Sequence, residues 1–407
     1  MKREHNLGLE PIELVHMGNT GSVGPMGDTA TFLNSKLRQN IAFAAYFEPN
    51  TIEEIAKELN VGIAFVEDEV LYLEEYGFLD LMPGQKYRTN IYIECVPFEI
   101  VQQVREISLQ VAKLICDEYV PKVIALAQNY SKEEIYVPDD DFNYFLWTLL
   151  IMAVTNHMEA TFNWDMLRRN NYMVKRKDGG EFVALATLYQ KELEELMKQE
   201  YYCGPMSVGN NEARAYSWSL STVFEDREHG WQVNETADYK NLVLFMKGKL
   251  PKTEAVLDKY VRLYERGLLR QEDDRVNVIV VKEYPQNGLV VQLDKEESGE
   301  DVKVDNVGAL RKFIPQMSPE LKGKIEALAV QKINLQKEYM PEHMHKLVEV
   351  YEKAKHINPI MVINELLKRG TLKPLSDVQK KGVMIAVYSD VLPNDVNFTC
   401  KKQPLAW

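Results

Sequence analysis

The fold is decided by the stretch Thr51–Leu79, which reads TIEEIAKELNVGIAFVEDEVLYLEEYGFL. Its first residue is a threonine, and Glu54 follows three positions later, which is the capping box that starts a helix. Apolar residues at helical spacing predict a short helix over Ile52–Leu59. After a tight turn, the same spacing predicts a longer helix over Ile63–Tyr76, and Gly77 ends it.

The residues on either side extend this pattern. Upstream, Phe32–Phe47 has the apolar spacing of a helix, and Pro49-Asn50 breaks the chain after it. Downstream, Phe78–Met82 is predicted to be a strand, Pro83-Gly84 its turn and Tyr87–Ile93 the returning strand.

The order helix, short helix, turn, longer helix and β-hairpin resembles the winged helix-turn-helix domains of bacterial transcription regulators. The resemblance is carried by the stretch quoted above and by the wing LMPGQKYRTNIYI at 81–93, and it covers about residues 31–94. It implies a DNA-binding fold, although winged helices also serve as protein-interaction modules.

A second stretch repeats part of this pattern. In VLDKYVRLYERGLLRQEDDRVNVIVV, Val256 lies eleven residues before Gly267 and Leu263 four before it, as Val66 and Leu73 precede Gly77. A large apolar pair follows each glycine, and a polar turn leads into a β-rich strand. Upstream, residues 239–247 form a candidate helix and Pro251 a candidate start of the next. We therefore predict a second winged helix over residues 238–284, against the alternative of a generic helix and hairpin.

The rest of the chain predicts a mainly helical α+β protein. A long helix over Phe98–Tyr130 is interrupted near Pro121, and another starts at Asp139 and runs to about Leu167. Residues 172–188 are predicted to form a hairpin, 189–200 a helix and 213–225 an extended segment. The predicted domains are a flexible N-terminal segment at 1–30 with a glycine at every third position over 18–27, the winged helix at 31–96, an α+β block at 97–235 that is a candidate effector or dimerisation domain, the second winged helix at 238–284 and a C-terminal helical region at 306–407.

Composition limits the classes of function. The chain has 407 residues, with 48 lysines and arginines against 61 aspartates and glutamates, and its formal net charge is −13. A mean negative field repels phosphate, so a protein that coats nucleic acid or an anionic membrane is disfavoured, while a single local basic face remains open. The four cysteines lie far apart without a C-x-x-C pair, which disfavours disulfides or a zinc site and favours the cytoplasm. The longest apolar run, Phe145–Val154, is too short for a membrane span, and no signal peptide is expected.

Charge separates the two candidate DNA-binding modules. Residues 51–90 carry a net charge of −6, and the helix at 63–76 has five acids and no base, so only Lys86 and Arg88 of the wing suit phosphate. Residues 240–270 carry a net charge of +5, which is the best electrostatic footprint for DNA in the chain, although a solvated basic face is the plainer interpretation. Here the predicted DNA contacts are Lys252, Lys259, Arg262, Arg266 and Arg270.

Signs of catalysis are weak. His343 and His345 are two positions apart, which places them on different faces of a helix, and we interpret them as surface histidines. No metal or nucleophile signature is present, so neither an enzyme nor a cofactor is expected. An aromatic-rich helix is interpreted either as plain core or as the wall of a ligand pocket, formed by Tyr144, Trp147, His157 and Trp164.

These observations predict a cytoplasmic, DNA-binding transcription regulator with an attached sensor or dimerisation region, and a homodimer is one candidate state. The alternative is a non-catalytic interaction module, whose acidic winged helix contacts a basic face of the transcription machinery, because acidic surfaces steer towards basic partners.

Overall fold

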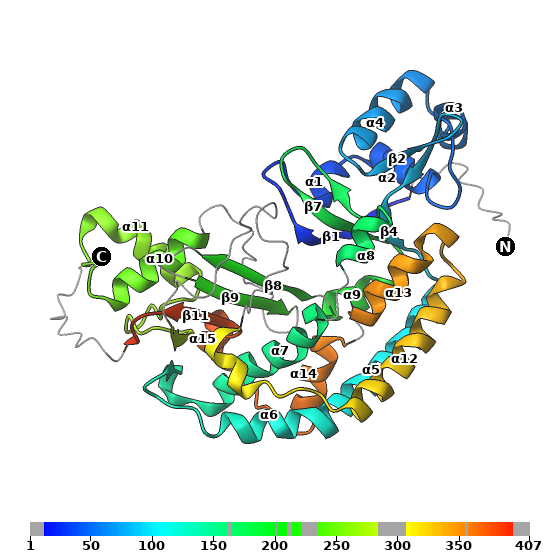
Figure 1. The fold of residues 1–407 in the computed structure, drawn as a ribbon. Helices are drawn as coiled ribbons and strands as arrows, with labels where there is room; N and C mark the ends of the chain where they lie inside the picture. Colours follow the sequence, from blue (N-terminus) through cyan, green and yellow to red (C-terminus); the bar gives the residue numbers. More distant parts are fainter. Residues whose placement is uncertain are drawn as a thin grey trace. The chain divides into compact units, whose positions relative to one another are not determined.

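The structure is a computed structural model that describes residues 12–160, 164–200, 202–209, 214–220, 235–283, 307–354 and 357–393. The fold is mixed α+β, mainly helical, with several sheets (Figure 1). Close contacts divide the chain into two units, so the predicted block at 97–235 is shared between them and is not one domain. The first unit comprises residues 1–108, 159–197 and 325–356, and the second comprises 109–158, 198–324 and 357–407.

The helices that the sequence predicted best lie in the first unit. Helix α3 (Ile52–Leu59) starts at the expected capping box, in which Thr51 Oγ1 accepts from the Glu54 amide and the Glu54 carboxylate accepts from the Thr51 amide. Helix α4 (Ile63–Glu75) ends one residue earlier than predicted, before Gly77 at φ +80°. The helix predicted upstream is two helices, because Ser35 caps a new start. They are α1 (Thr29–Phe32) and α2 (Lys36–Ala44).

The predicted returning strand is split in two. Strand β2 (Leu79–Met82) pairs with β3 (Lys86–Thr89) as an antiparallel hairpin, which confirms the predicted hairpin. At Asn90 the chain leaves the hairpin, and β4 (Ile91–Glu94) pairs in parallel with a strand more distant in sequence, β7 (Glu181–Leu188). The expectation of one strand over Tyr87–Ile93 is therefore wrong.

The N-terminal segment was predicted to be irregular, but it contains a strand. Strand β1 (Leu14–Ser22) pairs antiparallel with β7, and β6 (Val174–Lys175) pairs with the start of β7 as the predicted hairpin. Part of the glycine spacing has a steric reason, because a Cβ on Gly21 would lie 2.5 Å from the Glu181 carbonyl oxygen. Residues 1–11 lie outside the described range.

Helices complete the first unit. Its core joins the apolar faces of α2–α4, the sheet β1-β7-β4 and two C-terminal helices. Two long helices, α5 and α12, contribute residues to both units. The helices in question are α5 (Phe98–Leu114), α8 (Trp164–Arg169), α9 (Glu194–Glu200), α12 (Pro319–Lys337) and α13 (His345–Ala354).

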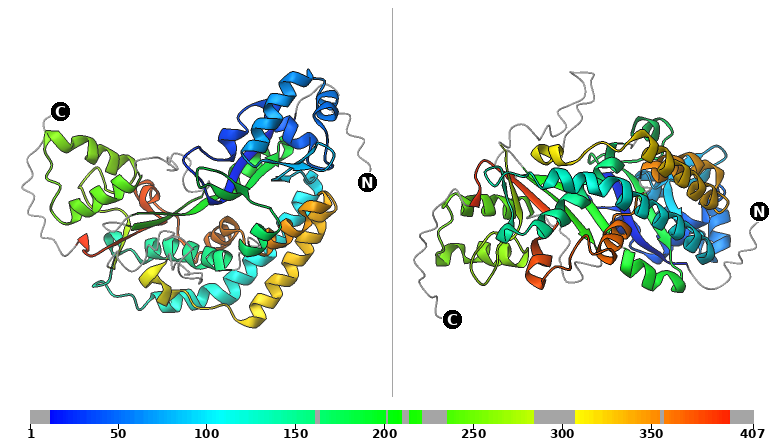
Figure 2. Two further views of the ribbon diagram at one scale, coloured as in Figure 1. Left: turned by 45° about the horizontal axis from the view of Figure 1, so that its top comes forward. Right: turned by 90° about the horizontal axis from the view of Figure 1, so that it is seen from below.

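The second unit is built on a five-stranded sheet of order β5-β10-β11-β9-β8, in which β10 and β11 are parallel and the other neighbours antiparallel. Figure 2 shows the green strands β8 and β9 running beside the red β11. The C-terminal region was predicted to be mainly helical with no strand, and β11 corrects this. The strands are β5 (Ile135–Tyr136), β8 (Tyr202–Gly209), β9 (Arg214–Leu220), β10 (Ile279–Lys282) and β11 (Ile385–Ser389).

Most helices of the second unit lie close to predicted ones, but the sequence did not predict the helix at Asp377–Gly382. The interruption near Pro121 is a π-helix at Ile115–Tyr119, which accommodates a proline that has no amide hydrogen to donate. The helices are α6 (Val120–Ala127), α7 (Phe142–Ala160), α10 (Glu235–Met246), α11 (Leu257–Glu265), α14 (Pro359–Lys368) and α15 (Asp377–Gly382). No helix among the described residues is long and apolar enough to cross a membrane.

The predicted second winged helix is embedded in this unit. Helix α11 is followed by Gly267 at φ +65° and by a bridge between Leu269 and Val276, as the sequence repeat requires. The strand after the bridge, β10, belongs to the five-stranded sheet, so residues 238–284 do not form a separate domain. A short 3-10 turn at Glu254–Val256, rather than Pro251, precedes α11.

Candidate interaction surface

Helix α4 has one face in the core and one in solvent. Val66, Val70 and Leu73 are fully buried and fix the helix against α2 and α3. The opposite side leaves large apolar side chains exposed, among them Phe65, which is 70% accessible. The exposed residues of α4, called here the exposed α4 face, are Ile63, Phe65, Glu67, Asp68, Leu71 and Glu75, and Ile63 and Phe65, two positions apart, lie at opposite edges of this face.

The charge on this face is negative and only partly compensated. Glu69 is bound by the Nε of Arg38 at 2.5 Å, and Glu75 lies 3.6 Å from the Nζ of Lys177. Glu67 and Asp68 are exposed and form no ion pair with the residues that the structure describes. The helix itself carries no base. The face therefore presents apolar groups beside two free carboxylates.

The basic residues of the β2–β3 hairpin pair with nearby acids of the same unit. The Nζ of Lys86 lies 3.3 Å from Glu54 Oε2, and the Nη2 of Arg88 lies 3.1 Å from Asp80 Oδ2 on the partner strand. Lys86 is half-buried, with 41% of its side chain accessible, whereas Arg88 is mostly covered. Of the two predicted phosphate contacts, Lys86 is the more accessible, but it is paired with Glu54.

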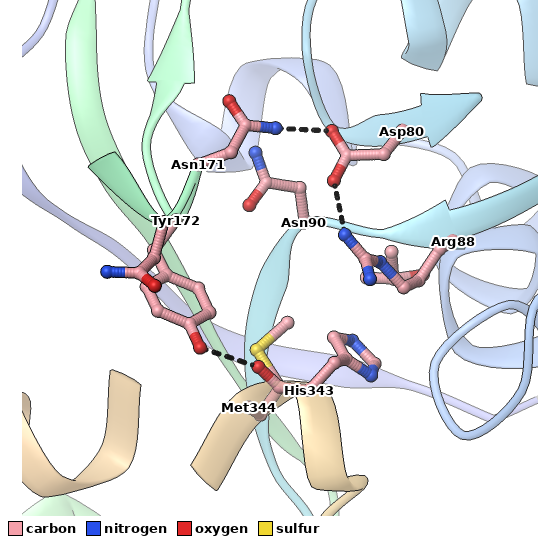
Figure 3. Close-up of a pocket in the computed structure, with 9 residues that line it drawn as sticks. Asp80, Arg88, Asn90, Asn171, Tyr172, His343 and Met344 are labelled. Carbon is pink, nitrogen blue, oxygen red and sulfur yellow. Dashed lines mark hydrogen bonds and ion pairs between the residues drawn. The ribbon is translucent and has the colours of Figure 1, made fainter. Parts of the chain in front are cut away.

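A small polar pocket lies behind the hairpin in the first unit (Figure 3). It has a volume of about 180 Å³ and is lined by Asp80, Arg88, Thr89, Asn90, Asn170, Asn171, Tyr172, His343 and Met344. Asp80 joins two of its walls. One carboxylate oxygen of Asp80 accepts a hydrogen bond from the Arg88 guanidinium, and the other accepts one from Asn171 Nδ2 at 3.1 Å. On the opposite wall, the Tyr172 hydroxyl donates to the His343 carbonyl oxygen at 2.9 Å. These contacts tie the wing to two distant segments of its unit.

His343 departs from the prediction of a surface histidine. It is half-buried in this pocket, and burial, with the positive charge of Arg88 nearby, lowers its pKa to about 4. The imidazole is therefore neutral at physiological pH. His345 is also half-buried, and its Nε2 lies 3.2 Å from the Met340 carbonyl oxygen. No group of three His, Cys, Asp or Glu side chains in the described ranges is placed to hold a metal ion.

The predicted basic cluster of residues 252–270 is largely occupied by internal acids. Arg262 and Arg266 do share a helical face, but both turn to Asp238 on α10, at 2.9 and 3.7 Å. Arg266 is only 9% accessible, so its prediction as a surface phosphate contact is wrong. Lys259 is half-buried and forms no ion pair with any described residue.

The other two predicted contacts in this cluster are also held. The Nζ of Lys252 lies 3.1 Å from Asp274 and 3.0 Å from the Tyr264 hydroxyl. Arg270 binds Asp139, and its Nε donates to Asn277 at 3.2 Å. Most basic side chains of this cluster therefore form ion pairs with neighbouring carboxylates.

The described aromatic side chains of α7 belong to the core and do not line a pocket. Tyr144 and Trp147 are buried in the second unit, and each satisfies its polar atom with a main-chain carbonyl, that of Asn277 for the tyrosine and that of Lys373 for the indole. The side chains of His157 and Trp164, the other two residues of this prediction, lie outside the described part of the chain.

Sequence reasoning missed Asp80, Asn90 and Asn171. Each is an ordinary polar residue at a strand or turn, and they meet only because the hairpin packs beside residues 170–172. The one local signal was the Asp80–Arg88 pair, which follows from the hairpin register. No protein-family model, curated protein or solved structure matches the chain.

Proposed function

We propose that this chain is a non-catalytic transcription regulator in which residues 31–96 form a winged helix-turn-helix module. The observation that carries the proposal is the layout of α3, α4 and the β2–β3 hairpin. A three-residue turn separates α3 from α4, α4 packs on α2 and α3 through one stripe, and the hairpin follows directly (Figure 1). Winged helices use this layout to present one helix and one wing to a partner.

The negative charge of the module favours a protein, rather than DNA, as its binding partner. A recognition helix in the major groove runs between two rows of phosphates, and each acidic side chain there is repelled. Helix α4 offers five acids and no base, and Lys86, the more accessible cation of the hairpin, is paired with Glu54. We therefore infer that the module acts by binding another protein of the transcription machinery.

Direct DNA binding is the second candidate, and one feature favours it. The first turn of α4 is apolar and Gly62 caps it without a side chain, so Ile63 and Phe65 could meet thymine methyl groups with Lys86 on the backbone. In the second unit, Lys259 would add a phosphate contact.

Two measurements test the proposal. RNA sequencing of the source cell with and without the gene should show a defined set of altered transcripts, and no altered transcripts would reject a regulator. Anisotropy of the full chain with random duplex DNA at low salt separates the candidates, because phosphate contacts give tight binding that falls steeply with salt. We expect no such binding; salt-sensitive binding that is lost in Lys86→Ala would favour DNA.

A further inference from the structure

The exposed α4 face concentrates apolar side chains that the fold does not use. Isolated exposed apolar residues are common on protein surfaces, whereas several exposed on one short element favour an interaction site. Of the nine large apolar residues exposed in the described ranges, three lie on this one helix, namely Ile63, Phe65 and Leu71. A fourth, Leu81, is on the adjoining strand β2.

The spacing on this face alternates apolar and acidic groups. Ile63, Glu67, Leu71 and Glu75 follow one another at intervals of four, which places them along one stripe of the helix. Phe65 and Asp68 are three apart and form a second, shorter row. A partner that lies along α4 would therefore meet apolar and negative groups in turn.

This alternation specifies the chemistry of the partner. Glu67 and Asp68 have no described cation beside them, so a partner gains by supplying lysine or arginine at those points. Ile63, Phe65 and Leu71 require apolar side chains between the cations. Nucleic acid and anionic lipid provide negative charge where these carboxylates stand, and both are disfavoured.

Helix α4 is also held rigidly, so docking needs little reorganisation. Its inner stripe is fully buried, and Arg38 both binds Glu69 and lies 4.0 Å over the Tyr72 ring, which fixes the side of the helix. A rigid apolar surface keeps the entropic cost of association low.

We propose that the exposed α4 face binds a basic amphipathic helix of a partner protein, with lysines or arginines on Glu67 and Asp68 and apolar side chains on Ile63, Phe65 and Leu71. The inference rests on the proposed function, since it names the partner of the same module.

A binding experiment with the full chain tests this surface. The probe is a synthetic amphipathic helical peptide of leucine and lysine, and its counterpart has glutamate in place of each lysine. Fluorescence anisotropy should show binding of the basic peptide alone. Phe65→Ser and Glu67→Lys should each raise the Kd about tenfold, as expected for central interface residues.

Helix α12 supplies matched controls in the same unit. Val330 is exposed like Leu71, and Glu326 is an exposed acid four positions before it. Val330→Ser and Glu326→Lys should leave the Kd unchanged. Equal weakening by the α12 variants would overturn the proposal, because it would show general attraction to an acidic protein. So would direct binding of duplex DNA to the wild type, measured without the peptide, that Phe65→Ser abolishes.

Failure of the inference and failure of the proposed function give different results. If loss of the gene alters transcripts but cells carrying Phe65→Ser or Glu67→Lys keep the wild-type transcript pattern, the docking face is overturned and a regulator remains. Peptide binding with the expected variant pattern, but no altered transcripts on loss of the gene, would support the face and reject the regulator. Circular dichroism of each variant establishes that it is folded.

Discussion

Asn90 and Asn277 make the same contacts in two different parts of the chain. The side-chain amide of each donates to the carbonyl oxygen of the glycine that ends the preceding helix, at 3.1 Å for Gly77 and 3.2 Å for Gly267. The main-chain amide of each donates to the carbonyl of the residue after that glycine, at 3.0 and 2.9 Å. The repeat that the glycines predicted thus extends to the two asparagines, which lock the strand to the end of the helix.

Removing the side-chain amide should lower the free energy of unfolding more at Asn277 than at Asn90. Asn277 is 1% accessible and forms two further side-chain hydrogen bonds, to the Val378 carbonyl and from Arg270. Asn277→Ala should lower the free energy of unfolding by about 2–4 kcal/mol and Asn90→Ala by about 1 kcal/mol, since buried groups left unpaired carry the larger penalty. Urea unfolding followed by circular dichroism measures both. Equal losses would contradict the argument.

Local signals explain what the sequence predicted well. The capping box at Thr51 and Glu54 and the glycine at 77 act over a few residues, so α3, α4 and the hairpin could be placed from sequence. Strand β4 could not, because its partner β7 lies about ninety residues away and pairing depends on tertiary packing. The strand in the N-terminal segment was hidden for the same reason, since it pairs with β7, against which Gly21 is closely packed.

The candidate site shows the same division. Arg262 and Arg266 lie four positions apart and so share a helical face, but their spacing does not tell whether that face turns to solvent or to a buried acid such as Asp238. The acidity of α4 was evident from sequence. Its consequence became specific only when burial of Val66 and Val70 fixed which side remains exposed.

Removing the Arg266 side chain should lower the free energy of unfolding, whereas removing the Lys259 side chain should leave it nearly unchanged. Arg266→Ala leaves the carboxylate of Asp238, which is 3% accessible, with one partner fewer in a buried setting. We expect a loss of about 3 kcal/mol in the free energy of unfolding, as for other broken buried pairs. Lys259→Ala should change it by less than about 0.5 kcal/mol. Thermal unfolding of both variants checks this, and a silent Arg266→Ala would show that the pair is not structural.

Gly267 and Gly370 form a matched test of steric fit. Both have positive φ, at +65° and +71°, but a Cβ on Gly267 would lie 2.3 Å from the Lys381 carbonyl oxygen, whereas a Cβ on Gly370 meets open space. Gly370→Ala should cost about 1 kcal/mol from backbone strain alone. Gly267→Ala should cost about 3 kcal/mol or more, because the main chain must also move. Chemical denaturation of the two variants should separate them clearly, and similar midpoints would show that the contact relaxes easily.

His343 should make the first unit sensitive to acid. Its pKa of about 4 lies below the value near 6.5 that it has when unfolded, so the unfolded chain takes up its proton first as pH falls. The stability that neutral His343 contributes is present above pH 6.5 and is lost as pH falls from there towards 4. After allowance for solvent screening, this amounts to roughly 1–2 kcal/mol.

Unfolding free energies of wild type and His343→Gln between pH 7 and 4 measure this dependence. The variant should be flatter with pH, because the titrating group is gone. Tyr172→Phe serves as the control, since it removes the hydrogen bond to the His343 carbonyl but keeps the imidazole. It should lower stability by a similar amount at every pH. A wild-type slope that survives in His343→Gln would assign the acid sensitivity to another group.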